Sequence, residues 1–377
     1  MRASHTVGYL IACSLVLVVA GTTALAAEEW IIETVAAAEG HVSLLLSAGG
    51  VLRACFQLVD PCCSPGYCFR DALGWSGVET VDSDNLGGDY AELGLDAAGR
   101  PVVAYQKDGH LWVAVRTDEG WAPELVDDRE GAGKHLDMAI DSVSGRCHVA
   151  YSMGGYGLYH AVSDGSSWAL EELRTVDQAS YECGICLDSG GYPHVSYYAA
   201  DIGALGYGFL DGLGWQFETV DGPKALLGLR STIELDGADQ PHIAYRDHNF
   251  SGPLKYATKS AGSWIIEIVD DTGSSGNLSS IALDPTGSPC IAYREHDNDV
   301  VRYAERVDGI WTFAMVSSID SGSVSLQVDE DGTPHILCTL GGEILHAWKG
   351  DPATFPPQPN PMTWWCCRGR LITQLSR

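Results

Sequence analysis

Short apolar segments alternate with polar turns along the chain, and one arrangement of them recurs. Each copy opens with a tryptophan strand such as 264–269, followed by a segment that ends in Leu-Asp, as at 281–284. A third segment reads Pro-His-Ile-Ala-Tyr at 241–245, and a fourth reads Leu-Lys-Tyr-Ala at 254–257. Segments of roughly five residues bounded by Gly, Asp or Ser are typical of strands joined by turns. No segment keeps a helical period, so we expect no helices.

The tryptophans that open the copies are spaced by 45, 46, 47, 47, 49 and 47 residues. They are Trp30, Trp75, Trp121, Trp168, Trp215, Trp264 and Trp311. A period in this range, with four strands in each copy, indicates the blades of a propeller. We therefore predict an all-β fold, a seven-bladed β-propeller of four-stranded antiparallel blades, with the Leu-Asp strand innermost and the Trp strand outermost. Five tyrosines are expected to fill the space between blades: Tyr105, Tyr151, Tyr197, Tyr245 and Tyr293.

The two ends of the repeat complement each other. Residues 30–35 form a Trp strand with no blade before it, and residues 344–348 form a fourth segment with no Trp strand after it. We predict that the two pair antiparallel, so that the N-terminal strand closes the last blade and removes two exposed edges. The alternative, an open solenoid, leaves the first strand without a neighbour.

The first 26 residues have the pattern of a secretory signal peptide. A nearly continuous apolar run at 9–20 precedes the small-residue cleavage pattern Ala-Leu-Ala at 24–26. We expect a secreted or periplasmic protein with no membrane segment after cleavage. A lipid anchor at Cys13 is disfavoured, because most of the apolar run follows this cysteine whereas a lipoprotein signal places it before.

Composition divides the remaining chain and narrows its partners. The propeller is predicted over 28–349, followed by a Pro-rich linker at 350–361 and a short basic tail at 362–377 that we expect to be disordered. The 22 basic and 50 acidic residues give a net charge of -28, which argues against nucleic acid and anionic membranes as partners. The acids are spread over every repeat, so solubility is the simplest explanation. We predict a monomer without cofactors.

Several of the twelve cysteines allow specific predictions. Cys55 and Cys68 fall at small positions of neighbouring strands in the first blade, and we predict a disulfide between them. Cys183 and Cys186 lie three apart on one strand and so face opposite sides, which prevents them from sharing a bond or a metal. Three further cysteines are expected to be small buried residues: Cys147, Cys290 and Cys338.

Four histidines occupy the same position in four blades: His148, His194, His242 and His335. Blades distribute them around the ring, too far apart for one ion with His–metal distances of roughly 2 Å. We therefore predict no metal site and expect these histidines to form local hydrogen bonds.

The third and fourth segments resemble those of secreted bacterial propellers related to the sialidase and Asp-box superfamily, over about residues 30–349. The turns at 117–121 and 163–168 look like shortened Asp boxes. Asp-box turns are structural, so this resemblance implies a fold and not a chemistry.

In a propeller, the loops between the second and third strands and the loops between blades share one face. Tyr-Arg-Asp-His at 245–248 and Tyr-Arg-Glu-His at 293–296 would lie there. A sialidase-like site needs arginines for a substrate carboxylate, a Tyr–Glu pair as nucleophile and base, and an acid. The candidates for these roles are Arg230, Arg246, Arg294, Tyr181, Glu182, Asp247 and Glu295. His248 and His296 are candidate ligand-binding residues, and His135 lies in a nearby segment between blades.

Three functions fit this sequence. We favour a non-catalytic binding scaffold that recognises a glycan, peptide or surface partner on its loop face, because repeated motifs are usually architectural. The alternative is a sialidase-like glycoside-processing enzyme that uses the arginine cluster on the same face. The third is a purely structural envelope component.

Overall fold

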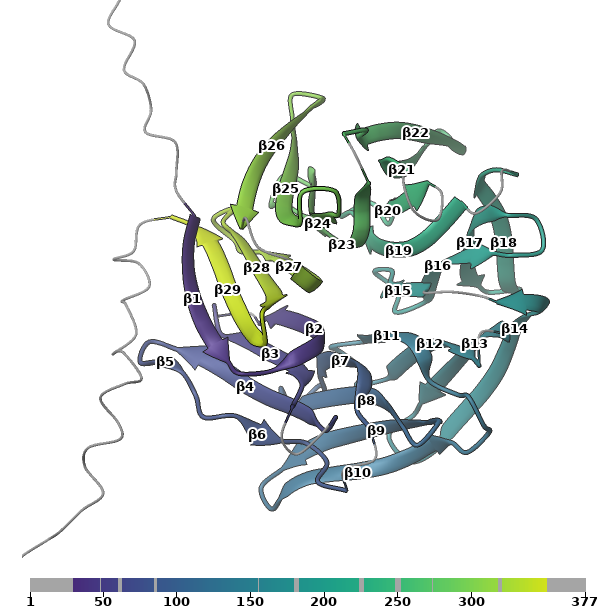
Figure 1. Ribbon diagram of the computed structural model, residues 1–377. Helices are drawn as coiled ribbons and strands as arrows, with labels where there is room; N and C mark the ends of the chain where they lie inside the picture. The colour runs from purple at the N-terminus through teal and green to yellow at the C-terminus, as the bar shows by residue number, and fades with distance from the viewer. Residues whose placement is uncertain are drawn as a thin grey trace, which may run out of the picture.

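A computed structural model describes residues 30–350, apart from 48, 60–62, 85–86, 155, 180–182, 224–226, 248–251, 273 and 318–320. In this part of the chain, seven antiparallel sheets stand side by side around a central axis (Figure 1). The predicted seven-bladed propeller is therefore confirmed. The predicted signal peptide and C-terminal tail lie outside the described residues.

Each blade begins with its innermost strand. Blades 1 to 4 contain β2 (Glu39–Leu46), β3 (Leu52–Gln57), β4 (Pro65–Asp71), β5 (Gly74–Trp75) and β6 (Glu79–Thr80); β7 (Asp89–Leu95), β8 (Pro101–Lys107), β9 (His110–Thr117) and β10 (Gly120–Asp127); β11 (Lys134–Ile140), β12 (Cys147–Met153), β13 (Tyr156–Ser163) and β14 (Trp168–Ala179); and β15 (Cys183–Leu187), β16 (Pro193–Ala199), β17 (Ala204–Asp211) and β18 (Gly214–Asp221). Blades 5 to 7 contain β19 (Leu227–Leu235), β20 (Pro241–Asp247), β21 (Leu254–Ser260) and β22 (Ser263–Asp270); β23 (Ser275–Leu283), β24 (Pro289–Glu295), β25 (Val300–Val307) and β26 (Ile310–Ser317); and β27 (Ser321–Val328), β28 (Pro334–Leu340), β29 (Glu343–Lys349) and β1 (Trp30–Ala36).

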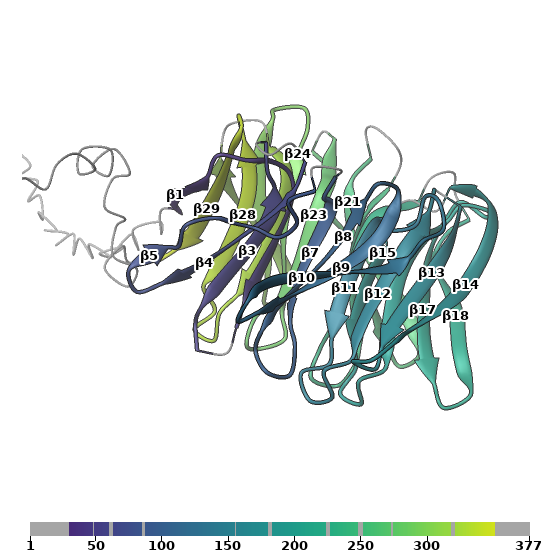
Figure 2. The ribbon, with the colours of Figure 1, turned by 90° about the horizontal axis from the view of Figure 1, so that it is seen from below.

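The up-and-down order of strands gives the disc two different faces, which the edge-on view separates (Figure 2). We call one the loop face, because it carries the connections between second and third strands and the connections between blades. The other, the turn face, carries the turns between first and second and between third and fourth strands. Every innermost strand therefore begins at the loop face and ends at the turn face.

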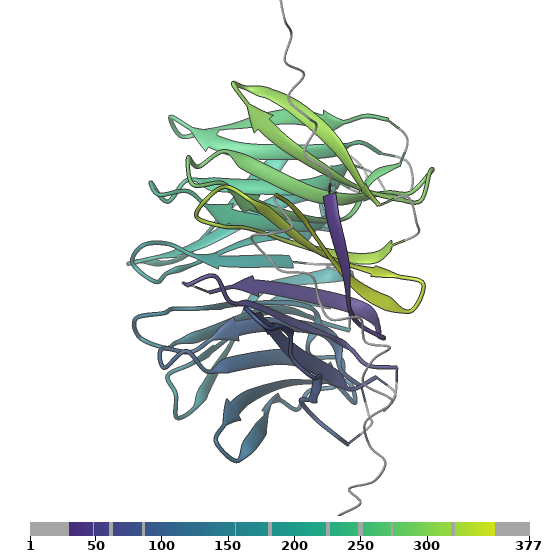
Figure 3. The same cartoon turned by 90° about the vertical axis from the view of Figure 1, so that its left-hand side faces the viewer.

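The ring is closed by the N-terminal strand, as predicted. β1 pairs antiparallel with β29, with Trp30 opposite Lys349, and becomes the outer strand of blade 7 (Figure 3). The β1 carboxylate of Glu33 then accepts hydrogen bonds from Arg70 Nε at 2.7 Å and Trp75 Nε1 at 2.9 Å, both in blade 1. It also lies 3.0 Å from Nδ1 of His346. Burial tends to raise the pKa of Glu33, but the hydrogen bonds from His346 and Arg70 outweigh it and hold this pKa at about 2.

The Glu33 contact is one copy of a link that explains the tryptophan period. In five blades, the indole N–H of the outer-strand tryptophan donates to a glutamate on the outer strand of the preceding blade, at 2.9 to 3.1 Å. The pairs are Trp75–Glu33, Trp121–Glu79, Trp215–Glu171, Trp264–Glu218 and Trp311–Glu267. Both partners must recur once per blade for this link to form, which fixes the register between neighbouring blades.

The five tyrosines predicted between blades are at most 2% exposed, and they form a second link near the loop face. Four of them donate their phenolic O–H to an aspartate at the end of the preceding blade, at 2.6 to 2.8 Å. The pairs are Tyr105–Asp82, Tyr151–Asp127, Tyr245–Asp221 and Tyr293–Asp270. In the fifth, Tyr197 instead accepts from Arg174 at 2.9 Å.

The repeated histidines form local contacts, as predicted. His242 Nδ1 is 2.6 Å from the hydroxyl of Tyr256, and its Nε2 is 3.6 Å from Asp236, the aspartate of the Leu-Asp strand. Asp236 Oδ1 also accepts the backbone N–H groups of Ala238 and Gln240 and so shapes the turn between the first two strands. These histidines therefore tie the second strand to that turn.

The predicted disulfide between Cys55 and Cys68 is wrong. Both thiols are free and buried, because Cys55 lies opposite Tyr67 and Cys68 lies opposite Ala54 in the β3–β4 ladder. Adjacent positions in a ladder face opposite sides of the sheet, and the two sulfurs belong to different apolar clusters. Cys183 and Cys186 belong to separate apolar clusters and so face opposite sides of their sheet, as predicted.

Blade 1 differs from the predicted repeat in its outer strand, which is divided into β5 and β6. The interruption falls at Ser76, Gly77 and Val78. The hydroxyl of Ser76 accepts the backbone N–H of Phe69 at 3.1 Å, and this side-chain bond replaces a regular ladder bond.

Replacing Glu33 with alanine is expected to destabilise the protein by about 3 kcal/mol, because it leaves the nearly buried guanidinium of Arg70 without its carboxylate. Chemical unfolding followed by circular dichroism measures this loss. Glu33→Gln retains an acceptor and should cost less, whereas the exposed control Glu119→Ala should cost almost nothing. Equal stability of Glu33→Ala and the wild type would show that closure does not depend on this carboxylate.

Candidate functional site

Two of the candidate arginines on the loop face interact with neighbouring side chains of the ring. Arg246 is 4% exposed and donates from Nη2 to the hydroxyl of Ser274, in the connection between blades 5 and 6. Arg294 forms an ion pair with Asp299 of its own loop at 2.8 Å. The side chain of Arg230 lies outside the described residues, so a three-arginine cluster stays a prediction.

The candidate carboxylates of the same face have partners of a structural kind. Asp247 lies 2.5 Å from the ammonium group of Lys255. Glu295 is 1% exposed and accepts from the backbone N–H and side-chain amide of Asn298, at 3.1 and 2.7 Å. His296 is exposed, and its backbone N–H donates to the carbonyl of Ser274 at 3.0 Å. Tyr181, Glu182 and His248 lie outside the described residues.

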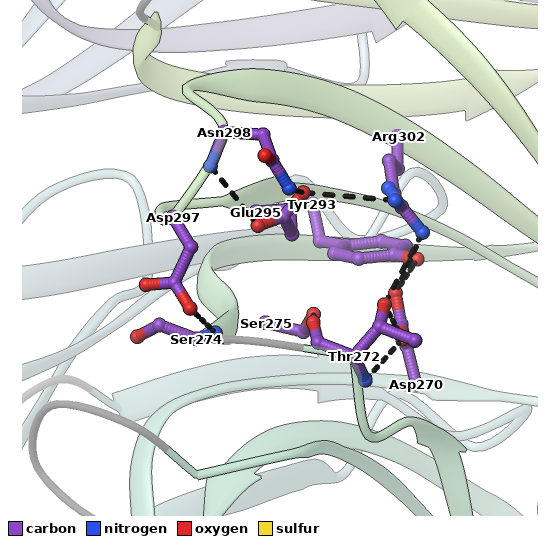
Figure 4. A network of polar contacts seen from close by, with 9 residues as sticks. All are labelled: Asp270, Thr272, Ser274, Ser275, Tyr293, Glu295, Asp297, Asn298 and Arg302. Carbon is purple, nitrogen blue, oxygen red and sulfur yellow. Dashed lines mark hydrogen bonds and ion pairs between the residues drawn. The ribbon is translucent and has the colours of Figure 1, made fainter.

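The junction between blades 5 and 6 shows how these groups satisfy each other (Figure 4). Asp270 accepts from the hydroxyl of Tyr293 at 2.6 Å and from the backbone N–H of Thr272 at 2.8 Å, and it lies 3.3 Å from Arg302. Asp297 of blade 6 accepts the backbone N–H of Ser274. A carboxylate surrounded by its own donors is poorly placed to bind a substrate, so we assign this network to joining the blades.

A different set of polar residues gathers along the axis. The seven innermost strands line a channel of about 620 Å³, which is within the range of small-ligand sites. Alternate residues of each strand face it, while residues such as Leu44, Leu93 and Leu136 are buried between blades. From the loop face inward, we name a mouth level, a middle level and a deep level, each two residues apart along every strand. The mouth level contains His41, Tyr90, His135, Leu278 and Ser323.

The mouth is formed by residues in an unusual backbone conformation. Tyr90, His135 and Leu278 have positive φ values of 56°, 49° and 62°, at the β-bulges that begin their strands. Non-glycine residues in this region store strain, and such residues concentrate at functional sites. The rings of Tyr90 and His135 lie 4.7 Å apart between centroids. His41 Nε2 lies 3.5 Å from Glu92, one level deeper.

Three carboxyl groups lie below this mouth: Glu92 and Asp137 at the middle level and Glu234 at the deep level. Burial raises the pKa of Glu92 to about 8 and that of Glu234 to about 7. Burial, with the charge of Glu92, also raises the pKa of Asp137 to about 7. Among the described residues that line the channel there is no lysine or arginine. The carboxyls therefore exchange protons near neutral pH instead of forming permanent ion pairs.

The wall formed by blades 5 to 7 carries hydroxyl groups at the middle level. The Ser280 hydroxyl accepts the backbone N–H of Leu326 and the Ser325 hydroxyl accepts that of Leu44, both at 3.0 Å. Each hydroxyl still has a proton to donate. Within the described chain, the hydroxyl of Thr232 at this level is buried without a hydrogen-bond partner. The channel thus has a wall of carboxyl and imidazole groups and a wall of hydroxyls.

Sequence reasoning missed this site. His135 was assigned only to a segment between blades, and Glu92, Asp137 and Glu234 were not singled out. A signal was available, because each of the three acids interrupts an innermost strand that is otherwise mostly apolar, as in Ala91-Glu92-Leu93. A polar residue at such a position must face the axis.

No family model and no curated protein matches this chain. Among solved structures, it is similar to a lectin from Burkholderia pseudomallei, with a TM-score of 0.64 and 14% identity over 83% of this chain and 98% of that one. An ulvan lyase bound to -[GlcA(1-4)Rha3S]- gives a TM-score of 0.60 and 14% identity over 87% and 98% of the two chains. The Aleuria aurantia lectin, as a variant in complex with Fucα1-6GlcNAc, gives 0.53 and 14% over 76% and 98%. These likenesses establish a shared propeller fold, and the sialidase relationship is not among them.

No helix in the described residues is both long enough and apolar enough to cross a bilayer.

Glu92 is expected to weaken the fold at alkaline pH. Its pKa is about 8 in the folded protein against an ordinary 4.5, so its protonated form stabilises the folded state fully below pH 4.5, and this contribution is lost as pH rises through 8. Across this window the free energy of unfolding should fall by up to about 1.4 kcal/mol per pH unit. Glu92→Gln should flatten the slope measured by urea unfolding, whereas Asp331→Asn, an exposed change on the turn face, should not. Parallel curves for Glu92→Gln and the wild type would contradict the assignment.

Proposed function

We propose that this protein is an exported, glycan-binding propeller whose binding site is the mouth of the central channel. The observation that carries the proposal is the convergence of His41, Glu92, Asp137, Tyr90 and His135 on one opening that leads into a cavity of about 620 Å³.

The chemistry of this opening suits a sugar. A sugar presents many hydroxyls that both donate and accept, together with apolar C–H faces. Glu92 and Asp137 supply acceptors, Ser280 and Ser325 supply donors, and the Tyr90 and His135 rings supply flat surfaces for C–H contact. Partly apolar, enclosed pockets with a few convergent polar groups are the usual form of small-ligand sites.

Two of the similar folds support this proposal at the level of architecture. Both are described as lectins, and one was solved with a fucose-containing disaccharide. Because these lectins are only 14% identical to this chain, their ligands indicate only which sugars to test first. Fucosylated glycans should be the first sugars tested.

A polysaccharide lyase is a second candidate, favoured by one observation. The adjacent Tyr90 and His135 side chains lie one level above Asp137, and Tyr or His can remove a proton from a uronate while a neutral acid donates to its carboxylate. The net charge of -28 and the absence of lysine or arginine among the described lining residues weigh against an anionic polymer. Incubation with ulvan and assay for an unsaturated uronate product tests this candidate directly, and product formation that is lost in His135→Ala would favour it.

Binding is expected to depend on the middle-level carboxyls. On a glycan array at about pH 9, where Glu92 and Asp137 are ionised, the wild type should bind a set of neutral glycans that Glu92→Gln/Asp137→Asn binds at least about tenfold more weakly, because two or more charge-assisted hydrogen bonds to the sugar become neutral ones. The double variant should fold, since it replaces two half-buried acids with neutral amides of similar shape, and circular dichroism verifies this. Asp331→Asn serves as the matched acid-to-amide control and should bind as the wild type does. Equal binding by all three proteins would place the site elsewhere, and no binding by the wild type would refute the proposed function.

A further inference from the structure

The wall of the channel is continuous around the axis. Each innermost strand contacts the next one, and the ring is completed by contact between β27 and β2. The seven junctions are β2–β7, β7–β11, β11–β15, β15–β19, β19–β23, β23–β27 and β27–β2. The described strands therefore leave no lateral slot, and a ligand can reach the middle level only along the axis.

This geometry separates two ways of binding a glycan. A polymer that lies in an open groove is recognised through its internal residues, and the groove needs two open ends. A channel enclosed on all sides receives a chain only by its end or by the tip of a branch. The carboxyls of Glu92 and Asp137 lie two residues below the mouth, a depth of roughly 7 Å at 3.3 Å per residue, so an internal residue of a chain lying across the mouth would not reach them.

We propose that the channel recognises the terminal residue of a neutral glycan, inserted end-on from the loop face; this inference rests on the proposed function. The terminal sugar donates hydroxyl protons to Glu92 and Asp137 on one wall and accepts from Ser280 and Ser325 on the other. The penultimate sugar lies at the mouth, against Tyr90 and His135. A terminal uronate is disfavoured, because its carboxylate would face three acids that line the same cavity.

An unpartnered hydroxyl supports a ligand at this depth. Thr232 is half-buried and lines the channel at the middle level. Within the described chain its hydroxyl has no hydrogen-bond partner. Buried polar atoms are normally satisfied, and a polar ligand at the middle level would satisfy this hydroxyl.

Thr232 offers a matched pair of variants. Thr232→Phe places a ring in the channel at the middle level and should close it to a sugar, while Thr232→Val retains the shape of threonine and removes only the hydroxyl. Both variants leave the mouth residues and the acids in place. Their melting temperatures, measured first, verify that each protein folds.

The test uses fucose-terminated, galactose-terminated and glucuronate-terminated oligosaccharides, each as a short and a long chain, immobilised by the reducing end. Each is presented once at equal numbers of chain ends and once at equal mass. We expect binding to a neutral series to follow the number of ends, to fall at least tenfold in Thr232→Phe, to change less in Thr232→Val, and to be absent for the glucuronate series.

The outcomes separate this inference from the function on which it rests. Binding that follows mass instead of ends, or that survives Thr232→Phe, overturns end-on recognition and leaves glycan binding intact. Preference for the glucuronate-terminated chains overturns the assignment to neutral sugars. If no oligosaccharide binds the wild type while its fold is intact, the proposed function fails and end-on recognition fails with it.

Discussion

A carboxylate that accepts hydrogen bonds from the neighbouring blade is the interaction on which this ring depends. In the described chain, the backbone ladders lie within each blade, so neighbouring blades are joined by side chains and connecting loops alone. Glutamates hold the outer edges through tryptophan indoles, and aspartates hold the loop face through tyrosine hydroxyls. Charge-assisted hydrogen bonds are stronger and more directional than neutral ones, and they fix the angle at which apolar faces meet.

This use of acids changes the meaning of the net charge of -28. Many carboxylates are bound to tryptophan, tyrosine, arginine or lysine of the next blade. These acids therefore link neighbouring blades as well as keeping the protein soluble. The acids of the channel are the contrast. Glu92, Asp137 and Glu234 are enclosed by the same ring, yet the described lining offers them no lysine or arginine, and their raised pKa values follow from that difference.

The repeat was enough to predict the blade count, the strand order and the closure, because the spacing of Trp30 to Trp311 reflects contacts that recur once per blade. The same regularity concealed the site. Asp247 and Glu295 recur because each binds a side chain of its own blade, and a repeat alone does not distinguish a structural residue from a ligand-binding residue. The Cys55–Cys68 prediction failed because a shift of one position in strand pairing reverses the side to which a residue points. The positions of Glu92 and Asp137 carry different residues in other blades, so the repeat does not mark them. Only the closure of the ring brings these two side chains together at the axis.

The closing ladder also determines how the molecule can be attached to anything else. Trp30 and Lys349 are paired neighbours at the turn face, so both residues lie on the side opposite the channel mouth. A tether, a support or a fused partner joined at Trp30 or Lys349 would therefore hold the propeller by its turn face. The mouth of the channel, on the loop face, would be directed away from the point of attachment. Both ends can therefore be anchored without obstructing the mouth.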